Sequence, residues 1–167
     1  LDVDESINLT DVLVIKAPMN AEADDEVTIK VMVSSQENSS VYKTYTSRTA
    51  VMQDFDPKLK VFGGDTQAAE PDEEVSYTIN ITNDGNGEDD ITLSLHGGNA
   101  TWGTLAESSF TLAAGESDET TLRVTAPDGT LAQNGYSITI RATSEDTSTK
   151  ANRNVFLNVQ QVFEVSV

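Results

Sequence analysis

A short run of oxygen-bearing side chains offers the clearest opportunity for chemistry in this sequence. Its acidic and amide members are Asp84, Asn86, Glu88, Asp89 and Asp90. Such hard oxygen ligands at nearby positions can converge on Ca²⁺ when the backbone turns. The spacing begins like a twelve-residue calcium loop, but Leu95 stands where that loop needs its final glutamate. A calcium site therefore competes with a solvated turn, which an acid-rich chain forms without any ligand.

Groups suited to catalysis are scarce. The chain has no cysteine, which excludes thiol nucleophiles, disulfides, zinc–thiolate sites and iron–sulfur clusters. His96 is the only histidine, so a catalytic triad or a multi-histidine metal site would depend on one residue just past a strand. Paired carboxylates could be present among 28 acids, yet no cleft-forming insertion or activated base is visible. We therefore expect no enzyme, and no cofactor other than the candidate calcium.

Four Asn-X-Ser/Thr sequons predict N-linked glycans, at Asn8, Asn38, Asn80 and Asn99. Asn38 and Asn99 fall in expected loops. Asn80 alternates with Ile79 and Ile81, so a glycan there would cover the outer face of a sheet and leave the core intact. Bare and glycosylated forms both remain open at this point.

The net charge of the chain limits the classes of partner that it can bind. Lys and Arg number 10 against 28 Asp and Glu, which gives a formal charge of -18. A negative potential of this size opposes binding to nucleic acid and to anionic membrane surfaces. The sequence has no run of 18 or more apolar residues, so we expect no direct membrane insertion. Apolar residues nevertheless fall in short alternating runs, which indicates a folded chain.

Strands dominate the expected structure. Val75, Tyr77, Ile79 and Ile81 alternate with polar residues, which is the period of a half-buried strand. Turn-forming residues 83–88 predict a tight hairpin to the next strand. The expected strands are 58–62, 74–82, 90–95, 109–112, 119–125, 135–143 and 152–159. Seven short antiparallel strands without a helical stripe predict an all-β immunoglobulin-like sandwich, with room for one extra short strand near Trp102.

An internal repeat organises the chain. Residues 1–37 lie over residues 110–146 at an offset of 109, with Leu13, Ala17, Pro18, Ile29 and Ser35 over Leu122, Ala126, Pro127, Ile138 and Ser144. About three extra residues then shift the offset, so Leu59 and Val61 lie over Val165 and Val167. We predict tandem sandwiches: the C-terminal half of one repeat at 1–54, a complete repeat at 55–160 and the first strand of another at 161–167. A half-sandwich leaves an open apolar face, so the sequence is expected to be an excerpt or to be completed by another chain.

The complete repeat resembles the NPCBM-associated immunoglobulin-like domain, which is found beside α-galactosidase modules and in archaeal and bacterial cell-surface repeat proteins. The resemblance covers residues 75–159 and rests on segments 77–87, 112–117, 122–127 and 135–144, together with Trp102. It departs from the family pattern at the insertion 131–134. The resemblance implies a structural or surface-display role without shared catalytic residues. Trp102 could then present a sugar-stacking ring, or it could pack between the sheets.

These observations favour an extracellular, cell-surface structural protein: a stalk, a surface-layer component or a filament of tandem repeats. Its expected partners are further copies, neighbouring repeats of the same protein, and glycans. Phe163, Val165 and Val167 alternate in 161–167, which suggests that this strand adds to the open sheet of a neighbouring subunit. The alternative is a non-catalytic spacer or glycan-binding module of a secreted hydrolase, which a catalytic domain elsewhere in the polypeptide would identify.

Overall fold

The computed structural model describes residues 13–163. The chain divides into two compact units at the peptide bond between Val51 and Met52. The helical structure in the described part of the chain is one 3₁₀ turn, Ala100–Trp102. No helix among these residues is long and apolar enough to cross a membrane.

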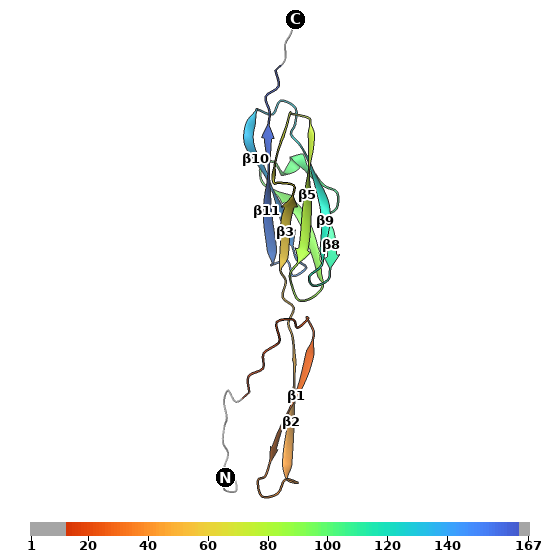
Figure 1. Ribbon diagram of the computed structural model, residues 1–167, viewed down its shortest axis with the longest axis vertical. Coiled ribbons are helices and arrows are strands. Elements are labelled where there is room, and N and C mark those ends of the chain that lie inside the picture. Colours follow the sequence, from red (N-terminus) through yellow and green to blue (C-terminus); the bar gives the residue numbers. More distant parts are fainter. Residues whose placement is uncertain (1–12, 164–167) are drawn as a thin grey trace. The chain divides into compact units, whose positions relative to one another are not determined.

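The second unit is a sandwich of two β-sheets (Figure 1). One sheet contains, in spatial order, β4 (Thr66–Ala69), β11 (Lys150–Val159), β10 (Gln133–Thr143), β6 (Asp89–His96) and β8 (Ser109–Leu112). The other contains β3 (Pro57–Phe62), β5 (Glu74–Asn83), β9 (Ser117–Thr125) and β7 (Gly103–Leu105). The all-β sandwich predicted from alternation is therefore confirmed, and β7 is the extra short strand near Trp102.

Alternating side chains from both sheets form one hydrophobic core. Ile79 and Ile81 of β5, Leu122 of β9 and Ile140 of β10 are completely buried. Their neighbours along each strand point outward because successive side chains of a strand alternate between faces. Each such aliphatic side chain contributes roughly 1.5–3 kcal/mol when it is removed from water. The closed core explains how the unit is held together without disulfides.

The predicted hairpin between residues 74–82 and 90–95 is wrong. β5 pairs with β3 and β9, whereas β6 pairs with β10 and β8, so the two strands lie in different sheets. Residues 83–88 cross between the sheets, and we call them the arch. Alternation does not distinguish the two arrangements, because paired strands and facing strands both turn one apolar side to the same core. The predicted strands pair with one another antiparallel, and β4, which was not predicted, adds a parallel pairing with β11.

The first unit contains one hairpin, β1 (Glu26–Ser34) paired with β2 (Tyr42–Ala50). One face of this hairpin carries Val27, Val31, Val33 and, across the ladder, Tyr45. These side chains are 45%, 46%, 62% and 58% exposed in that order. An isolated two-stranded hairpin is at best marginally stable in water, so this apolar face is incomplete by itself.

The hairpin β1–β2 has the same local geometry as β10–β11. Equivalent turns are closed by equivalent backbone hydrogen bonds. These are Ser35 N–H to Val41 C=O (2.9 Å) and Ser144 N–H to Thr149 C=O (3.1 Å), then Ala21 N–H to Pro18 C=O (3.1 Å) and Thr130 N–H to Pro127 C=O (3.2 Å). The internal likeness therefore extends from residue types to turn geometry.

Strand register corrects the second part of the repeat alignment. Ile29 pairs with Ser47, and Ile138 pairs with Val155, so the second strands match at an offset of 108. The turn 35–41 is one residue longer than the turn 144–149, instead of the three residues expected. The predicted partners of Leu59 and Val61 lie outside the described residues.

Candidate functional site

Asn83, the last residue of β5, gives the arch its shape. Its side chain is completely buried. The amide Nδ2 donates to the carbonyl oxygens of Gly87 (2.7 Å) and Leu112 (2.9 Å), and Oδ1 accepts from the Gly85 N–H (2.9 Å). One amide thereby satisfies three backbone groups where the chain leaves the sheet. A buried amide is stable in such a place because all these groups are hydrogen-bonded.

The arch holds the chain segment that leads into β3. We call residues 52–56 the entering segment. Asn86 Oδ1 accepts from Asp54 N–H (2.7 Å), Asn86 Nδ2 donates to the Met52 carbonyl (3.1 Å), and Asn86 N–H donates to the Asp54 carbonyl (3.2 Å). Gln53 Nε2 donates to the Glu88 carbonyl (2.6 Å). Asp84 N–H donates to the Asp56 carbonyl (2.9 Å). These five bonds hold the segment along one path.

Gly85 lets the entering segment approach the arch closely. A Cβ atom at this position would stand 2.3 Å from the Asp54 carbonyl oxygen and 2.9 Å from Asn83 Oδ1. Real Cβ atoms essentially never show contacts this short, so the two backbones could not stay in place. The glycine is required here by space, because a side chain would push the segment off the arch.

We call the five hydrogen bonds between the arch and the entering segment the clamp. An exposed ion pair follows it in the chain. Lys58 Nζ lies 2.5 Å from Asp56 Oδ1. This hydrogen bond raises the pKa of Lys58, and the negative charges of Asp56 and Asp84 act in the same direction. Both side chains are close to half exposed, so solvent screening keeps the contribution of the pair to stability small.

The residues predicted to bind calcium are used differently by the fold. Both polar groups of the Asn86 side chain are hydrogen-bonded to the entering segment. Asp89 is completely buried and accepts from the Glu145 N–H (3.0 Å), while its neighbour Asp90 is exposed and accepts from Thr111 Oγ1 (2.5 Å). Asp84 and Glu88 are exposed. Within residues 13–163, no three His, Asp or Glu side chains are grouped to hold a metal. Calcium binding stays a prediction.

The three sequon asparagines that the structure describes lie in a turn, on a strand and before the 3₁₀ turn. Asn38 accepts from the Ser40 N–H (3.0 Å) in the exposed turn between β1 and β2. Asn80 lies on the outer side of β5 and is partly exposed. Asn99 precedes the 3₁₀ turn and donates to the Ser137 carbonyl (3.3 Å). Asn8 lies outside the described residues. Glycosylation of all four stays a prediction.

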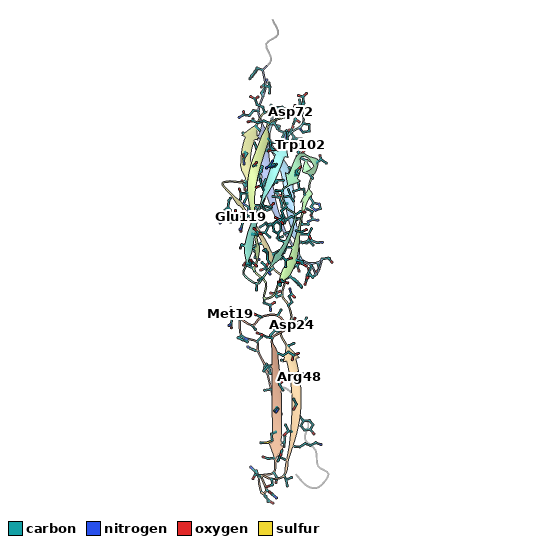
Figure 2. The ribbon with its side chains drawn as sticks, turned by 90° about the vertical axis from the view of Figure 1, so that its right-hand side faces the viewer. Met19, Asp24, Arg48, Asp72, Trp102 and Glu119 are labelled. Carbon is teal, nitrogen blue, oxygen red and sulfur yellow. The ribbon has the colours of Figure 1, made fainter. Side chains whose placement is uncertain are left out.

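The remaining candidates take ordinary positions. His96 ends β6, with its Nε2 2.9 Å from Ser94 Oγ on the same strand. Trp102 packs against Tyr136 with 5.0 Å between ring centroids, at the edge of the core (Figure 2). Phe163 is 79% exposed. Val165 and Val167 lie outside the described residues, so the proposed strand exchange stays a prediction.

Sequence reasoning missed the role of the arch. Residues 83–87, Asn-Asp-Gly-Asn-Gly, were readable as a turn, and that turn exists. The partners of Asn86 stand 32 and 34 positions earlier in the chain, and no local pattern announces them. The available signal was the second asparagine, because a simple turn needs only one Asn-Gly pair. Chemically, the arch binds the backbone of a neighbouring segment together with the side chain of Gln53.

Comparisons with known proteins agree with this sandwich. The family model FixG_C, "IG-like fold at C-terminal of FixG, putative oxidoreductase", matches residues 72–158, slightly more than half of the chain. The immunoglobulin-like character inferred from the residues is confirmed, but this is a different family from the NPCBM-associated one. No curated protein matches the sequence.

Three solved structures are similar to this chain at low sequence identity. A family 123 glycoside hydrolase from Clostridium perfringens matches at 9% identity and a TM-score of 0.50, over 65% of this chain and 28% of that one. The E. coli chaperone DraB matches at 13% identity and a TM-score of 0.44, over 64% of this chain and 55% of that one. The D00-D0 domain of intimin matches at 10% identity and a TM-score of 0.43, over 84% and 87%. These likenesses concern the fold alone. By the match of its sandwich, the chain belongs to the FixG_C family of immunoglobulin-like domains.

Proposed function

We propose that this protein is an extracellular structural protein whose immunoglobulin-like domains are strung in tandem, as in a stalk, a surface-layer component or a filament. The observation that carries the proposal is the clamp between the arch and the entering segment. Through these hydrogen bonds the sandwich fixes the path of the segment that leads into its own first strand. An unclamped linker of five residues would behave as a flexible coil.

The internal repeat supports the tandem arrangement. The hairpin β1–β2 matches β10–β11 in register and in turn hydrogen bonds. In the sandwich, the apolar face of the equivalent hairpin buries Ile138 and Ile140, whereas Val31 in the first unit is 46% exposed. Residues 1–54 are then the C-terminal half of one sandwich, 55–160 a complete one and 161–167 the start of another. Strands equivalent to β3, β5 and β6, which precede residue 110 in the complete repeat, would complete the first.

The charge distribution supports a surface exposed to solvent. Only three ion pairs occur among the described residues, although the chain carries 28 acidic side chains. Unpaired negative charge keeps neighbouring molecules apart, which suits a stalk at a cell surface. N-linked glycans on Asn38, Asn80 and Asn99 would add to this separation, and neighbouring repeats or further copies would be the protein's main partners.

The clamp is tested by amide hydrogen exchange in the full chain. Asn86→Ala removes the acceptor of the Asp54 N–H, so exchange at Asp54 should rise by roughly tenfold or more, the effect of about 1–1.5 kcal/mol. Asn86→Asp retains the acceptor but loses the donor to Met52, and should give an intermediate increase. Asn80→Ala is the matched control, since Asn80 lies on β5 away from the entering segment. Unchanged exchange at Asp54 in Asn86→Ala would remove the main support for the proposal.

Electron cryo-microscopy of the native assembly tests the wider function. Tandem sandwiches joined end to end, at the cell surface, are the expected result. A catalytic domain held by this chain would instead favour a second candidate, a non-catalytic module attached to an enzyme such as a secreted hydrolase. The description of the matching family, which places this fold at the C-terminal part of FixG, is the observation that keeps this second candidate in view.

A further inference from the structure

The segment that leaves the sandwich repeats the segment that enters it. The offset of 108 fixed by the β11 register places Val159, Gln161 and Phe163 over Val51, Gln53 and Phe55. We call residues 160–163 the leaving segment. The two positions that differ between entering and leaving segments, 52 and 54, carry Met and Asp in the first and Gln and Val in the second.

The positions that are identical in the two segments differ from the changed positions in how the entering segment is bound. Gln53 is recognised through its side chain, which donates to the Glu88 carbonyl, and Phe55 is partly buried. Met52 and Asp54 are recognised through backbone groups alone, and both side chains are exposed. Of the two retained side chains, that of Gln53 hydrogen-bonds the arch and that of Phe55 is partly buried. The two side chains that change, at positions 52 and 54, are exposed in the entering segment.

The leaving segment is bonded to its own sandwich at its first residue, where Gln160 N–H donates to the Ala69 carbonyl (2.9 Å), and among the described residues it makes no hydrogen bond to an arch. Phe163 is 79% exposed, in contrast to its counterpart Phe55, and Val162 is 50% exposed. Beside the segment lies an open depression of about 620 Å³, lined by loop 128–132, residues 70–71 and residues 160–162. The lining mixes the exposed apolar side chains of Leu131 and Val162 with polar and acidic ones such as Glu70 and Asp128.

We propose that the leaving segment is the ligand of a second arch, carried by a further immunoglobulin-like domain that follows on the same polypeptide. That arch would offer an asparagine equivalent to Asn86 and a glycine equivalent to Gly85. A second copy of this chain is a poorer partner, because its arch is already occupied by its own entering segment through five hydrogen bonds. This inference rests on the tandem organisation proposed above and identifies the joint between successive domains.

A tandem fusion tests the proposal directly. Residues 1–163 are followed by a second copy of residues 56–167, so that 160–163 replaces the natural entering segment of the second sandwich. The second sandwich keeps its whole closed core. The Val162 amide, equivalent to that of Asp54, should exchange roughly tenfold or more slowly than in the unfused chain, as expected for one new backbone hydrogen bond. Asn86→Ala in the second copy should abolish this protection, and the same change in the first copy should leave it intact.

The outcomes separate this proposal from the function on which it rests. If Asp54 is protected and Val162 exchanges freely in a folded fusion, the leaving segment is no arch ligand and the inference fails alone. If neither amide responds to Asn86→Ala, the clamp itself fails and the proposed function loses its support. If Val162 becomes protected in the unfused chain as its concentration rises, another copy is the partner, which overturns the assignment to a following domain.

Discussion

Substituting Gly85 tests the geometry of the arch most severely. An alanine Cβ would lie 2.3 Å from the Asp54 carbonyl oxygen, whereas ordinary contact begins near 3.4 Å. The carbonyl must therefore withdraw by about 1 Å, which is enough to break the bonds that Asn86 makes to Asp54 and Met52. At about 1 kcal/mol for each of three bonds, the free energy of opening the entering segment falls by about 3 kcal/mol. Exchange of the Asp54 amide should then accelerate by roughly 100-fold.

Hydrogen exchange measured by NMR on the full chain gives this number residue by residue. Amides of β5, β9 and β10 should keep most of their protection, because the core residues are untouched and overpacking costs the sandwich only about 1–3 kcal/mol. Gly98→Ala is the control: nothing lies within 4 Å of a Cβ at Gly98, which is absent from the glycines with positive φ. It should change stability by less than about 0.5 kcal/mol. A folded Gly85→Ala chain with normal Asp54 exchange would refute the close approach.

Three further predictions concern the Tyr77 hydroxyl, the Asn83 amide and the net charge of the chain. Burial raises the pKa of Tyr77 from 10.0 to about 12, so its contribution to stability is complete below pH 10 and is lost as the pH rises toward 12. Urea unfolding should therefore show the wild type losing about 1.3 kcal/mol more than Tyr77→Phe between pH 9 and pH 11; equal losses would contradict this origin. Asn83→Ala leaves three backbone groups without their partner and should cost about 3 kcal/mol or more by urea unfolding, against little change in Asn80→Ala. Raising NaCl from about 0.05 to 0.5 M should raise the calorimetric Tm by a few degrees, because salt screens the net charge of -18. A further rise in CaCl₂ of equal ionic strength would reveal specific calcium binding, and a fall of Tm with salt would contradict the repulsion argument.

Alternation along each strand determined the sandwich from sequence. The burial of Ile79, Ile81 and Ile140 follows from side chains that alternate between a wet and a dry face, which is a property of a few neighbouring residues. The same local rule did not find β4, since its four residues, Thr-Gln-Ala-Ala, contain no large apolar side chain. Its place beside β11 depends on parallel pairing with a strand far along the chain.

Tertiary structure alone decided what the turn after β5 does. The residues 83–88 predict a turn in isolation, but only the assignment of β5 and β6 to different sheets makes that turn an arch. Its close-packed Gly85 and its Asn86 then contact a segment about thirty positions earlier, so the clamp is made of contacts that no local pattern contains. The sequence by itself determined where most strands of the sandwich run, because side-chain burial recurs at short, regular spacing. Which strands face each other, and which turn holds the neighbouring chain, were settled by packing between residues distant in sequence.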